Sequence, residues 1–315
     1  MKTCVTGGAG FIGSALVDRL VELGHEVTVL DNLSTGSRDN LSRSAGKVRF
    51  LEGDIRDRAA VDETVRGAEV VYHQAALAAV ARSVENPGEV TEVNVGGTLH
   101  VLLGARDARA RRVVFASSSS VYGDTPTLPK TETMPLTPLS PYAASKAAGE
   151  AYVSAFQGSY GLEGVSLRYF NVYGERQSPR SRYAAVVPRF IEAMAAGKPP
   201  VIYGDGQQTR DFTYVGDVVD ALVRAATAPE AGRGPINVGG GLRISVASLA
   251  AIVAEAVGFH GGVAHEASRV GDVRDSRADI RRAQAWLSWW PRTSLKEGVA
   301  RIVSGTCVVS PARAR

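Results

Sequence analysis

Short apolar runs alternate with longer segments of helical periodicity along the first half of the chain. Glycine-bounded segments with apolar residues at helical spacing are typical of helices, and they separate runs that are typical of buried strands. This alternation favours a doubly wound parallel sheet with helices on both faces, an α/β fold. The strands are expected within residues 2–8, 25–32, 47–55, 68–76, 111–119 and 164–174, and the main helices within 11–24, 92–108 and 142–160.

The alternation of predicted strands and helices becomes less regular after Gly174, where a polar stretch precedes further helices and short strands. This change predicts two domains. We expect residues 1–170 to form the larger domain, to which later segments at about 205–235 return. Residues 171–315 form mainly a smaller, mixed α/β domain for the substrate, and the last residues resemble a frayed tail.

Composition narrows the class of protein. The chain has 315 residues, 44% of them hydrophobic, which is enough for a large core. Its basic residues are scattered and its net charge is only +4, so nucleic-acid binding is not expected. Cys4 and Cys307 form neither a disulfide framework nor a metal site. No run is apolar enough to cross a membrane, and no secretory signal is evident, so a cytoplasmic protein is expected.

A glycine-rich turn joins the first predicted strand to the first predicted helix. Gly7, Gly10 and Gly13 follow G-x-x-G-x-x-G spacing, which allows a tight turn, a close approach to pyrophosphate and close packing of the helix. The free N–H groups and dipole of that helix favour phosphate binding. Asp31 ends the second strand, where a carboxylate binds both ribose hydroxyls of NAD and repels the extra phosphate of NADP. A Rossmann-type domain that binds NAD is therefore predicted.

Tyr142 and Lys146 lie one helical turn apart in the stretch PYAASKAAGE. Such spacing places both on one helix face, where the ammonium favours the phenolate that a proton-abstracting base requires. Ser118 ends the fifth strand, at the sheet edge where ligands bind in such folds, and it can hydrogen-bond the same substrate oxygen. These three residues are the candidate catalytic group.

Six motifs resemble those of the extended short-chain dehydrogenase/reductase family, and most closely its nucleotide-sugar 4-epimerases. They are TGGAGFIGS, DNLSTG, GDIRD, SSSSVYGD, SPYAASKAAGE and LRYFNVYG, in the order of that family. The resemblance implies that Tyr142 takes a proton from the sugar O4 while NAD takes hydride from C4, and that hydride then returns to the opposite face. It also implies a set of cofactor contacts: Gly7, Gly10, Phe11, Ile12, Gly13, Asp31, Asn32, Ser34, Thr35, Gly36, Asp54, Ile55, Ala75, Ala76, Asn94, Ser117, Tyr142, Lys146 and Tyr169.

The residues after Ser118 distinguish the reactions of this family. Related 4,6-dehydratases carry Asp–Glu there, and UDP-glucuronate decarboxylases keep a glutamate, whereas this chain has Ser119 and Ser120. Neither hydroxyl is a plausible base. The departure favours simple epimerisation and leaves a dehydratase or decarboxylase as the alternative. A non-catalytic, NAD-sensing regulator is a remoter one, because Tyr142 and Lys146 are both kept.

The resemblance also implies how a UDP-sugar is held. The contacts expected are Ser118, Ser119, Ser120, Asn171, Val186, Tyr203, Arg210, Arg269, Asp272 and Ser276, with the arginines on the diphosphate. Ser276 lies where epimerases restricted to plain hexoses carry tyrosine, so a roomier pocket is expected. Glucuronate, N-acetylhexosamine and plain hexose sugars all remain candidates. A homodimer is expected through the helix of Tyr142 and its neighbour.

Overall fold

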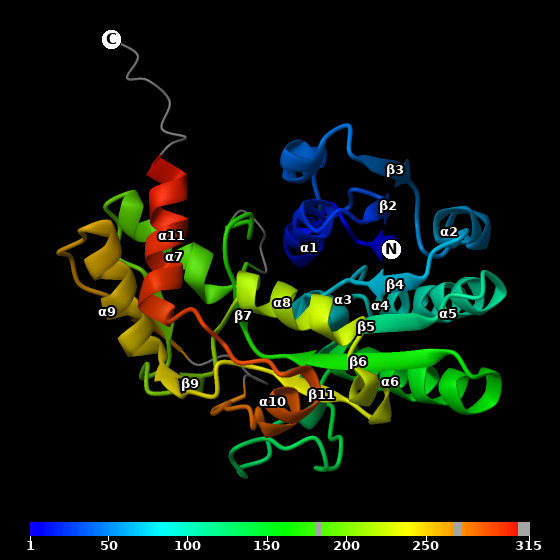
Figure 1. Cartoon of the computed structure of the whole chain (residues 1–315). Helices are drawn as coiled ribbons and strands as arrows, with labels where there is room; N and C mark the ends of the chain where they lie inside the picture. Colours follow the sequence, from blue (N-terminus) through cyan, green and yellow to red (C-terminus); the bar gives the residue numbers. More distant parts are fainter. Residues whose placement is uncertain (180–183, 268–272, 308–315) are drawn as a thin grey trace.

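The computed structural model describes residues 1–179, 184–267 and 273–307. Its centre is a seven-stranded sheet in the order β11-β6-β5-β4-β1-β2-β3, and every strand pair in it is parallel. The predicted Rossmann-type α/β fold is therefore confirmed (Figure 1). The strands are β1 (Lys2–Thr6), β2 (Glu26–Asp31), β3 (Val48–Glu52), β4 (Val70–His73), β5 (Arg112–Ser118), β6 (Glu163–Tyr169) and β11 (Ile236–Val238).

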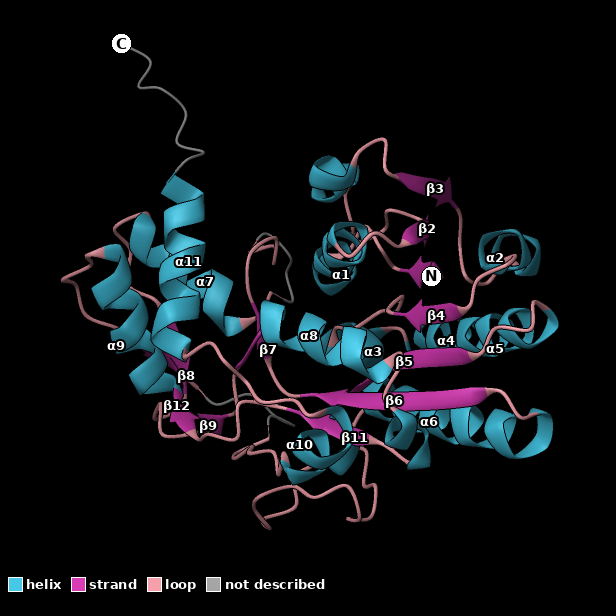
Figure 2. Ribbon diagram, viewed as in Figure 1, coloured by secondary structure: helices cyan, strands magenta, loops and turns pink. Residues whose placement is uncertain are grey.

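Helices cover both faces of this sheet (Figure 2). One face carries α1 (Phe11–Glu22) and α8 (Val215–Ala225), and the other carries α2 (Arg58–Val65), α5 (Gly97–Asp107) and α6 (Pro141–Tyr160). Shorter helical segments lie between these elements: η1 (Arg38–Ser44), α3 (Val80–Glu85), α4 (Pro87–Thr91), η2 (Glu92–Gly96), η3 (Ser119–Tyr122), η4 (Pro229–Arg233) and α10 (Arg281–Leu287).

The second half of the chain builds a smaller unit beyond the carboxyl ends of the sheet strands (Figure 1). Helices α7 (Val186–Ala195), α9 (Val246–Val257) and α11 (Leu295–Cys307) share one apolar core there. Three two-stranded ladders accompany them: β7 (Val172–Tyr173) with β10 (Thr213–Tyr214), β9 (Thr209–Arg210) with β12 (Ile244–Ser245), and β8 (Val201–Tyr203) with β13 (Ala264–Glu266).

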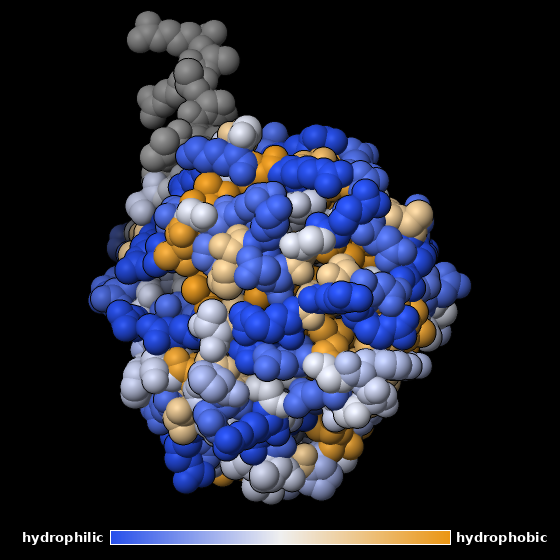
Figure 3. Space-filling model, turned by 45° about the vertical axis from the view of Figure 1, so that its right-hand side comes forward, coloured by the Kyte–Doolittle hydropathy of each residue, from blue (hydrophilic) through white to orange (hydrophobic). Residues whose placement is uncertain are grey.

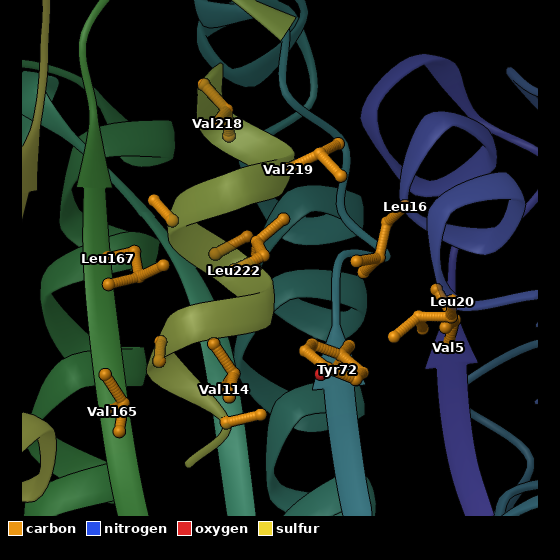
Figure 4. Packing of buried hydrophobic residues seen from close by; sticks show 14 of the residues in the cluster. Val5, Leu16, Leu20, Tyr72, Val114, Val165, Leu167, Val218, Val219 and Leu222 are labelled. Atoms are coloured by element: carbon orange, nitrogen blue, oxygen red, sulfur yellow. The ribbon is translucent and has the colours of Figure 1, made fainter. Parts of the chain in front are cut away.

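The later segments α8 and β11 return to the large sheet. Figure 4 shows Leu222 of α8 beside the strands that carry Leu167 and Val114, and Val219 on the side of α8 next to Leu16 of α1. All five side chains are buried, and burial of one such side chain stabilises a fold by about 1.5–3 kcal/mol. This packing holds the carboxyl ends of the strands in a fixed arrangement.

Two expected elements are broken in the structure. The predicted helix 92–108 begins with five π-helical residues, η2, before α5 starts at Gly97. The predicted sixth strand stops at Tyr169 and resumes as β7, because Asn171 takes a positive φ of 24° between them. The chain thereby leaves the large sheet and enters the smaller unit.

The surface is polar on the face that Figure 3 draws, where hydrophobic residues lie in small groups among hydrophilic ones. Within the described part of the chain, none of the helices combines the length and the apolar character that a membrane span needs. The same residues contain no group of three His, Cys, Asp or Glu side chains placed to hold a metal ion.

Candidate active site

The glycine turn after β1 has no room for side chains. Gly7 has a φ of +69°, and a Cβ there would lie 2.6 Å from the backbone nitrogen of Ala75. A Cβ on Gly13 would overlap the carbonyl of Gly7, and Gly10 is the N-cap of α1. Phe11, Ile12 and Gly13 form the first turn of that helix, so its free N–H groups face the space above the turn.

A cleft that is open to solvent lies beside this turn. The predicted cofactor residues that line it are Gly7, Asp31, Asn32, Ser34, Thr35, Asp54, Ile55, Ala75 and Ala76. The Asp31 carboxylate accepts hydrogen bonds from the backbone N–H groups of Ala9 at 2.9 Å and Leu33 at 2.8 Å. Gly36 packs so closely on Ala9 that a Cβ would lie 2.7 Å from its carbonyl carbon. The end of β2 therefore presents a carboxylate held in one orientation.

Charged residues that sequence reasoning missed also line this cleft. Arg56 donates from Nε to the Asp54 carboxylate at 3.0 Å, and this bond lowers the pKa of Asp54 to about 2 despite partial burial. Asn32 donates to the same carboxylate at 2.8 Å. Arg82 and Glu89 form a second ion pair, at 2.8 Å. Nothing in the sequence distinguishes Arg82 from an ordinary surface residue, because its place in the cleft depends on how α3 and α4 pack.

The helix that carries Tyr142 and Lys146 has well-defined ends. The Ser140 hydroxyl accepts from the backbone N–H of Ala143 at 3.1 Å, and Pro141 occupies the first helical position. Gly161 ends the helix in the left-handed conformation, with a φ of +70°. These signals fix α6 against the sheet and place both side chains beside the end of β5.

Lys146 is buried, with 4% of its surface exposed. Its ammonium donates to the Ala116 carbonyl at 2.8 Å and lies 5.0 Å from the ring centre of Phe115. Burial lowers the pKa of Lys146 to about 7. The ammonium lies 5.9 Å from the ring centre of Tyr142, so the two predicted catalytic residues are neighbours.

The pKa of the Tyr142 phenol is raised, whereas the sequence led us to expect that it is lowered. Burial raises the pKa of Tyr142, and a hydrogen bond with Ser118 opposes that increase. Burial is the larger of these two effects because desolvation disfavours the phenolate, and the expected lowering by Lys146 does not contribute to the shift.

Four consecutive serines form the end of β5 and the turn after it. The Ser118 oxygen caps η3 and accepts hydrogen bonds from the backbone N–H of Ser120 at 3.2 Å and from the Ser120 hydroxyl at 2.9 Å. The Ser117 hydroxyl instead donates to Glu150 of α6 at 2.5 Å. Ser117 and Ser118 therefore both contact α6, Ser117 through Glu150 and Ser118 through Tyr142.

A buried polar network supports this strand end, and sequence reasoning missed it. Arg168 of β6 pairs with Glu150 at 2.7 Å and donates to the Tyr122 hydroxyl at 2.8 Å. That hydroxyl donates in turn to Asn237 of β11 at 2.6 Å. The network joins β5, β6, β11 and α6 behind the three candidate catalytic residues.

Asn94 lies in the π-helical segment and is buried. Its side-chain oxygen accepts from the Leu77 N–H at 2.8 Å, and its nitrogen donates to the Ser145 hydroxyl at 3.0 Å. The Ser145 hydroxyl donates to the Tyr142 carbonyl at 2.8 Å. Asn94 therefore connects the loop after β4 with the first turns of α6.

The expected substrate residues lie around the smaller unit. Asn171 donates to the Asp211 carbonyl at 3.2 Å, and Arg210 donates to the Arg274 carbonyl at 3.1 Å. Val186 begins α7, Tyr203 ends β8, and Ser276 is buried beside β9. Arg269 and Asp272 lie outside the described residues, so their predicted contacts with the diphosphate and ribose stay predictions.

Known proteins with similar sequences identify the family to which the chain belongs. Residues 3–239 match the model of the NAD dependent epimerase/dehydratase family. The UDP-glucose 4-epimerase of Mycolicibacterium smegmatis is 44% identical over 312 residues, which cover 96% of this chain and 97% of that protein. The chain therefore belongs to the NAD-dependent epimerase/dehydratase family.

Solved structures agree with this assignment. UDP-N-acetylglucosamine 4-epimerase from Methanobrevibacter ruminantium M1, in complex with UDP-N-acetylmuramic acid, is 38% identical with a TM-score of 0.93, and 98% of each chain is covered. UDP-glucose 4-epimerase from Thermus thermophilus, in complex with NAD, is 40% identical with a TM-score of 0.91. That comparison covers 98% of this chain and all of the other. The tight glycine turn, the α1 N-terminus without a side-chain cap and the oriented Asp31 fit NAD, which is the cofactor.

Proposed function

We propose that this protein is an NAD-dependent 4-epimerase that inverts C4 of a UDP-sugar. The observation that carries the proposal is the grouping of Ser118, Tyr142 and Lys146 at the end of β5, next to the glycine turn and the cleft of Asp31. Bound NAD supplies a hydride acceptor and donor, and its oxidised ring supplies a positive charge. All other groups needed at C4 and O4 come from the chain.

Each of the three residues has a distinct role. The Tyr142 phenolate takes the proton from O4 when C4 is oxidised, and returns it when C4 is reduced from the opposite face. Ser118, already hydrogen-bonded to Tyr142, holds the same oxygen. Lys146 supplies a buried ammonium close to the phenol ring and binds cofactor ribose hydroxyls.

The serines after Ser118 oppose other reactions of the family. A dehydratase needs an acid and a base near C5 and C6, and the decarboxylases resembling this chain keep a glutamate in this segment. Here Ser119 and Ser120 begin η3, and the Ser120 hydroxyl donates to Ser118. They hydrogen-bond the substrate and the catalytic serine without taking protons from carbon.

The sugar pocket accommodates a large substituent. Ser276 is small and buried at 8% exposure, and its N–H donates to the Thr209 carbonyl at 3.1 Å. A serine here leaves space that a tyrosine would fill. We therefore favour an N-acetylhexosamine as the best substrate among the three sugar classes, with glucuronate and plain hexose sugars tested beside it.

We propose a homodimer as the assembled form. On α6, Ala144, Ala151, Ser154 and Ala155 are exposed, and Tyr152 lies beside them with 37% exposure. Small residues of this kind let the helices of two copies approach closely.

The free thiol Cys4 and the lack of any disulfide among the described residues favour a reducing compartment, and we propose the cytoplasm.

The function is tested by incubating the purified protein with UDP-glucose, UDP-N-acetylglucosamine and UDP-glucuronate and separating the C4 epimers by chromatography. We expect inversion, fastest with UDP-N-acetylglucosamine. Tyr142→Phe should lower turnover by a factor of about 10² to 10⁴. Ser276→Tyr should abolish activity with the N-acetyl sugar and retain activity with UDP-glucose. A 4-keto-6-deoxy sugar or a pentose as the product would contradict the proposal.

A further inference from the structure

Gln74 follows β4 directly and lines the dinucleotide cleft together with Gly7 and Ala75. Its backbone N–H donates to the Thr6 carbonyl at 3.1 Å, which fixes the residue at the carboxyl edge of the sheet. The preceding residue, His73, is held by Thr6 and Thr98 within the sheet and the helix layer beside it. Because consecutive strand residues point to opposite faces, Gln74 is directed to the other side.

The two ends of the Gln74 amide have different environments. Its oxygen accepts a hydrogen bond from the Tyr169 hydroxyl at 3.0 Å. Its nitrogen is buried, and none of the residues that the structure describes provides it with a hydrogen-bond acceptor. Tyr169 ends β6, so this bond reaches from β4 past the end of β5, which carries Ser118.

A buried amide nitrogen without an acceptor is costly, because it has lost its hydrogen bonds to water. Most buried polar groups in proteins are paired, so an unpaired donor on a residue that lines a ligand cleft indicates a ligand acceptor. The ligand of this cleft is rich in acceptor oxygens. Tyr169 also lies close enough to Tyr142 for the two phenols to affect one another electrostatically. The unpaired amide nitrogen of Gln74 therefore lies in the half of the cleft where the proposed reaction takes place.

We propose that Gln74 is a positioning residue: its amide nitrogen donates to an oxygen in the nicotinamide half of NAD, while its amide oxygen holds Tyr169. One side chain thereby ties the reacting half of the cofactor to the tyrosine beside the catalytic base. The inference rests on the proposed function for the identity of the site. It extends that function with a contact that the glycine turn and Asp31 do not make.

The test measures binding without turnover. NAD and AMP are titrated calorimetrically into the NAD-free wild type, Gln74→Met and Gln74→Glu. Methionine keeps the length of glutamine without its hydrogen bonds, so NAD should bind about 3- to 30-fold more weakly, the usual effect of one lost hydrogen bond. AMP affinity should not change, because the adenosine end at Asp31 and Asp54 is intact. Gln74→Glu keeps an acceptor for Tyr169 but adds an anion, so this variant should weaken NAD binding further.

Gln157→Leu is the matched control, since Gln157 is exposed on α6 and should leave both affinities unchanged. The inference is overturned if Gln74→Met and the wild type bind NAD with equal affinity. It is also overturned if Gln74→Met loses affinity for NAD and AMP equally, because that indicates a general distortion of the cleft. If circular dichroism shows that Gln74→Met is unfolded, the test rests on Gln74→Glu. Unchanged NAD affinity of Gln74→Glu would then refute the proposed contact. None of these outcomes affects the C4-inversion assay, so the inference and the proposed function fail separately.

Discussion

His73 is a buried base that the chain keeps neutral. Its Nδ1 lies 2.7 Å from the Thr6 hydroxyl and its Nε2 lies 2.9 Å from the Thr98 hydroxyl. The Thr98 hydroxyl donates to the Asn94 carbonyl at 2.6 Å, so Nε2 carries the proton and donates to Thr98. Burial, reinforced by the charge of Lys146, lowers the pKa of His73 from 6.5 to about 3.

This shift makes stability depend on pH. Between about pH 6.5 and 3 the unfolded chain binds a proton at His73 that the folded protein does not bind. The unfolding free energy of the NAD-free protein should therefore fall as pH falls through that window, by about 3 kcal/mol from pH 7 to 4 on account of His73. Urea unfolding at both pH values should show a smaller fall in His73→Gln. Identical pH profiles of the two proteins would refute this assignment.

Individual site residues were predictable to different degrees. Tyr142 and Lys146 are identified by their spacing, and Asp31 by its distance from the glycine turn. Gln74 was not identified, because a glutamine after a strand gives no sign of which face it occupies. The raised pKa of Tyr142 was also not predictable, since the extent of its burial depends on the packed structure.

At the scale of elements, α6 lies unusually close to β5. The helix crosses the sheet at Gly149, where a Cβ would collide with the Phe115 ring. The same ring lies beneath the Lys146 ammonium. The glycine therefore sets the distance between the helix of Tyr142 and the strand of Ser118.

Gly149→Ala tests this contact. The methyl group must displace either the Phe115 ring or the helix, so the variant should lose about 1–3 kcal/mol of unfolding free energy and a large part of its turnover. Gly158→Ala, on the same helix with open space around it, should gain up to about 1 kcal/mol. Chemical denaturation and epimerase assays of both variants provide the comparison. Equal stability changes in the two variants would show that close packing at Gly149 is unimportant.

Long periodic segments were predicted well, and interrupted ones were not. The end signals of α6 are explicit in the sequence, as Ser140, Pro141 and Gly161 show. The π-helical turn before α5 is not, because helical apolar spacing continues through it. Yet that turn places Asn94 against the loop after β4, so the irregularity serves the site.

At the scale of the whole molecule, a partly buried ion pair connects the segment after β7 to helix α1 beside the sheet. Arg176, which follows β7, binds Asp18 of α1 at 2.5 Å, and Asp18 also accepts from the Ser44 hydroxyl at 2.5 Å. Arg176 has a positive φ of 66°, which costs energy that its surroundings must offset. This contact depends on tertiary packing and was not predictable from the sequence. The sequence predicted two domains and a returning segment, but not which residues connect the two domains.

The proposed homodimer is a prediction at this scale. Light scattering at micromolar concentration should give about twice the chain mass of 33.2 kDa. Ala151→Arg, on the exposed face of α6, should give the mass of a single chain, because a long charged side chain prevents close helix contact. Ala285→Arg, on exposed α10, is the control and should remain dimeric. A single-chain mass for the wild type would contradict the proposal.

The central claim is that hydride leaves C4 of a UDP-sugar and returns to the same carbon while Tyr142 handles the O4 proton. Its most direct test is epimerisation of UDP-N-acetylglucosamine carrying deuterium at C4, followed by mass spectrometry and nuclear magnetic resonance. The account predicts an inverted product that retains deuterium at C4, and almost none from Tyr142→Phe. Loss of the label to water, or undiminished turnover by Tyr142→Phe, would contradict it.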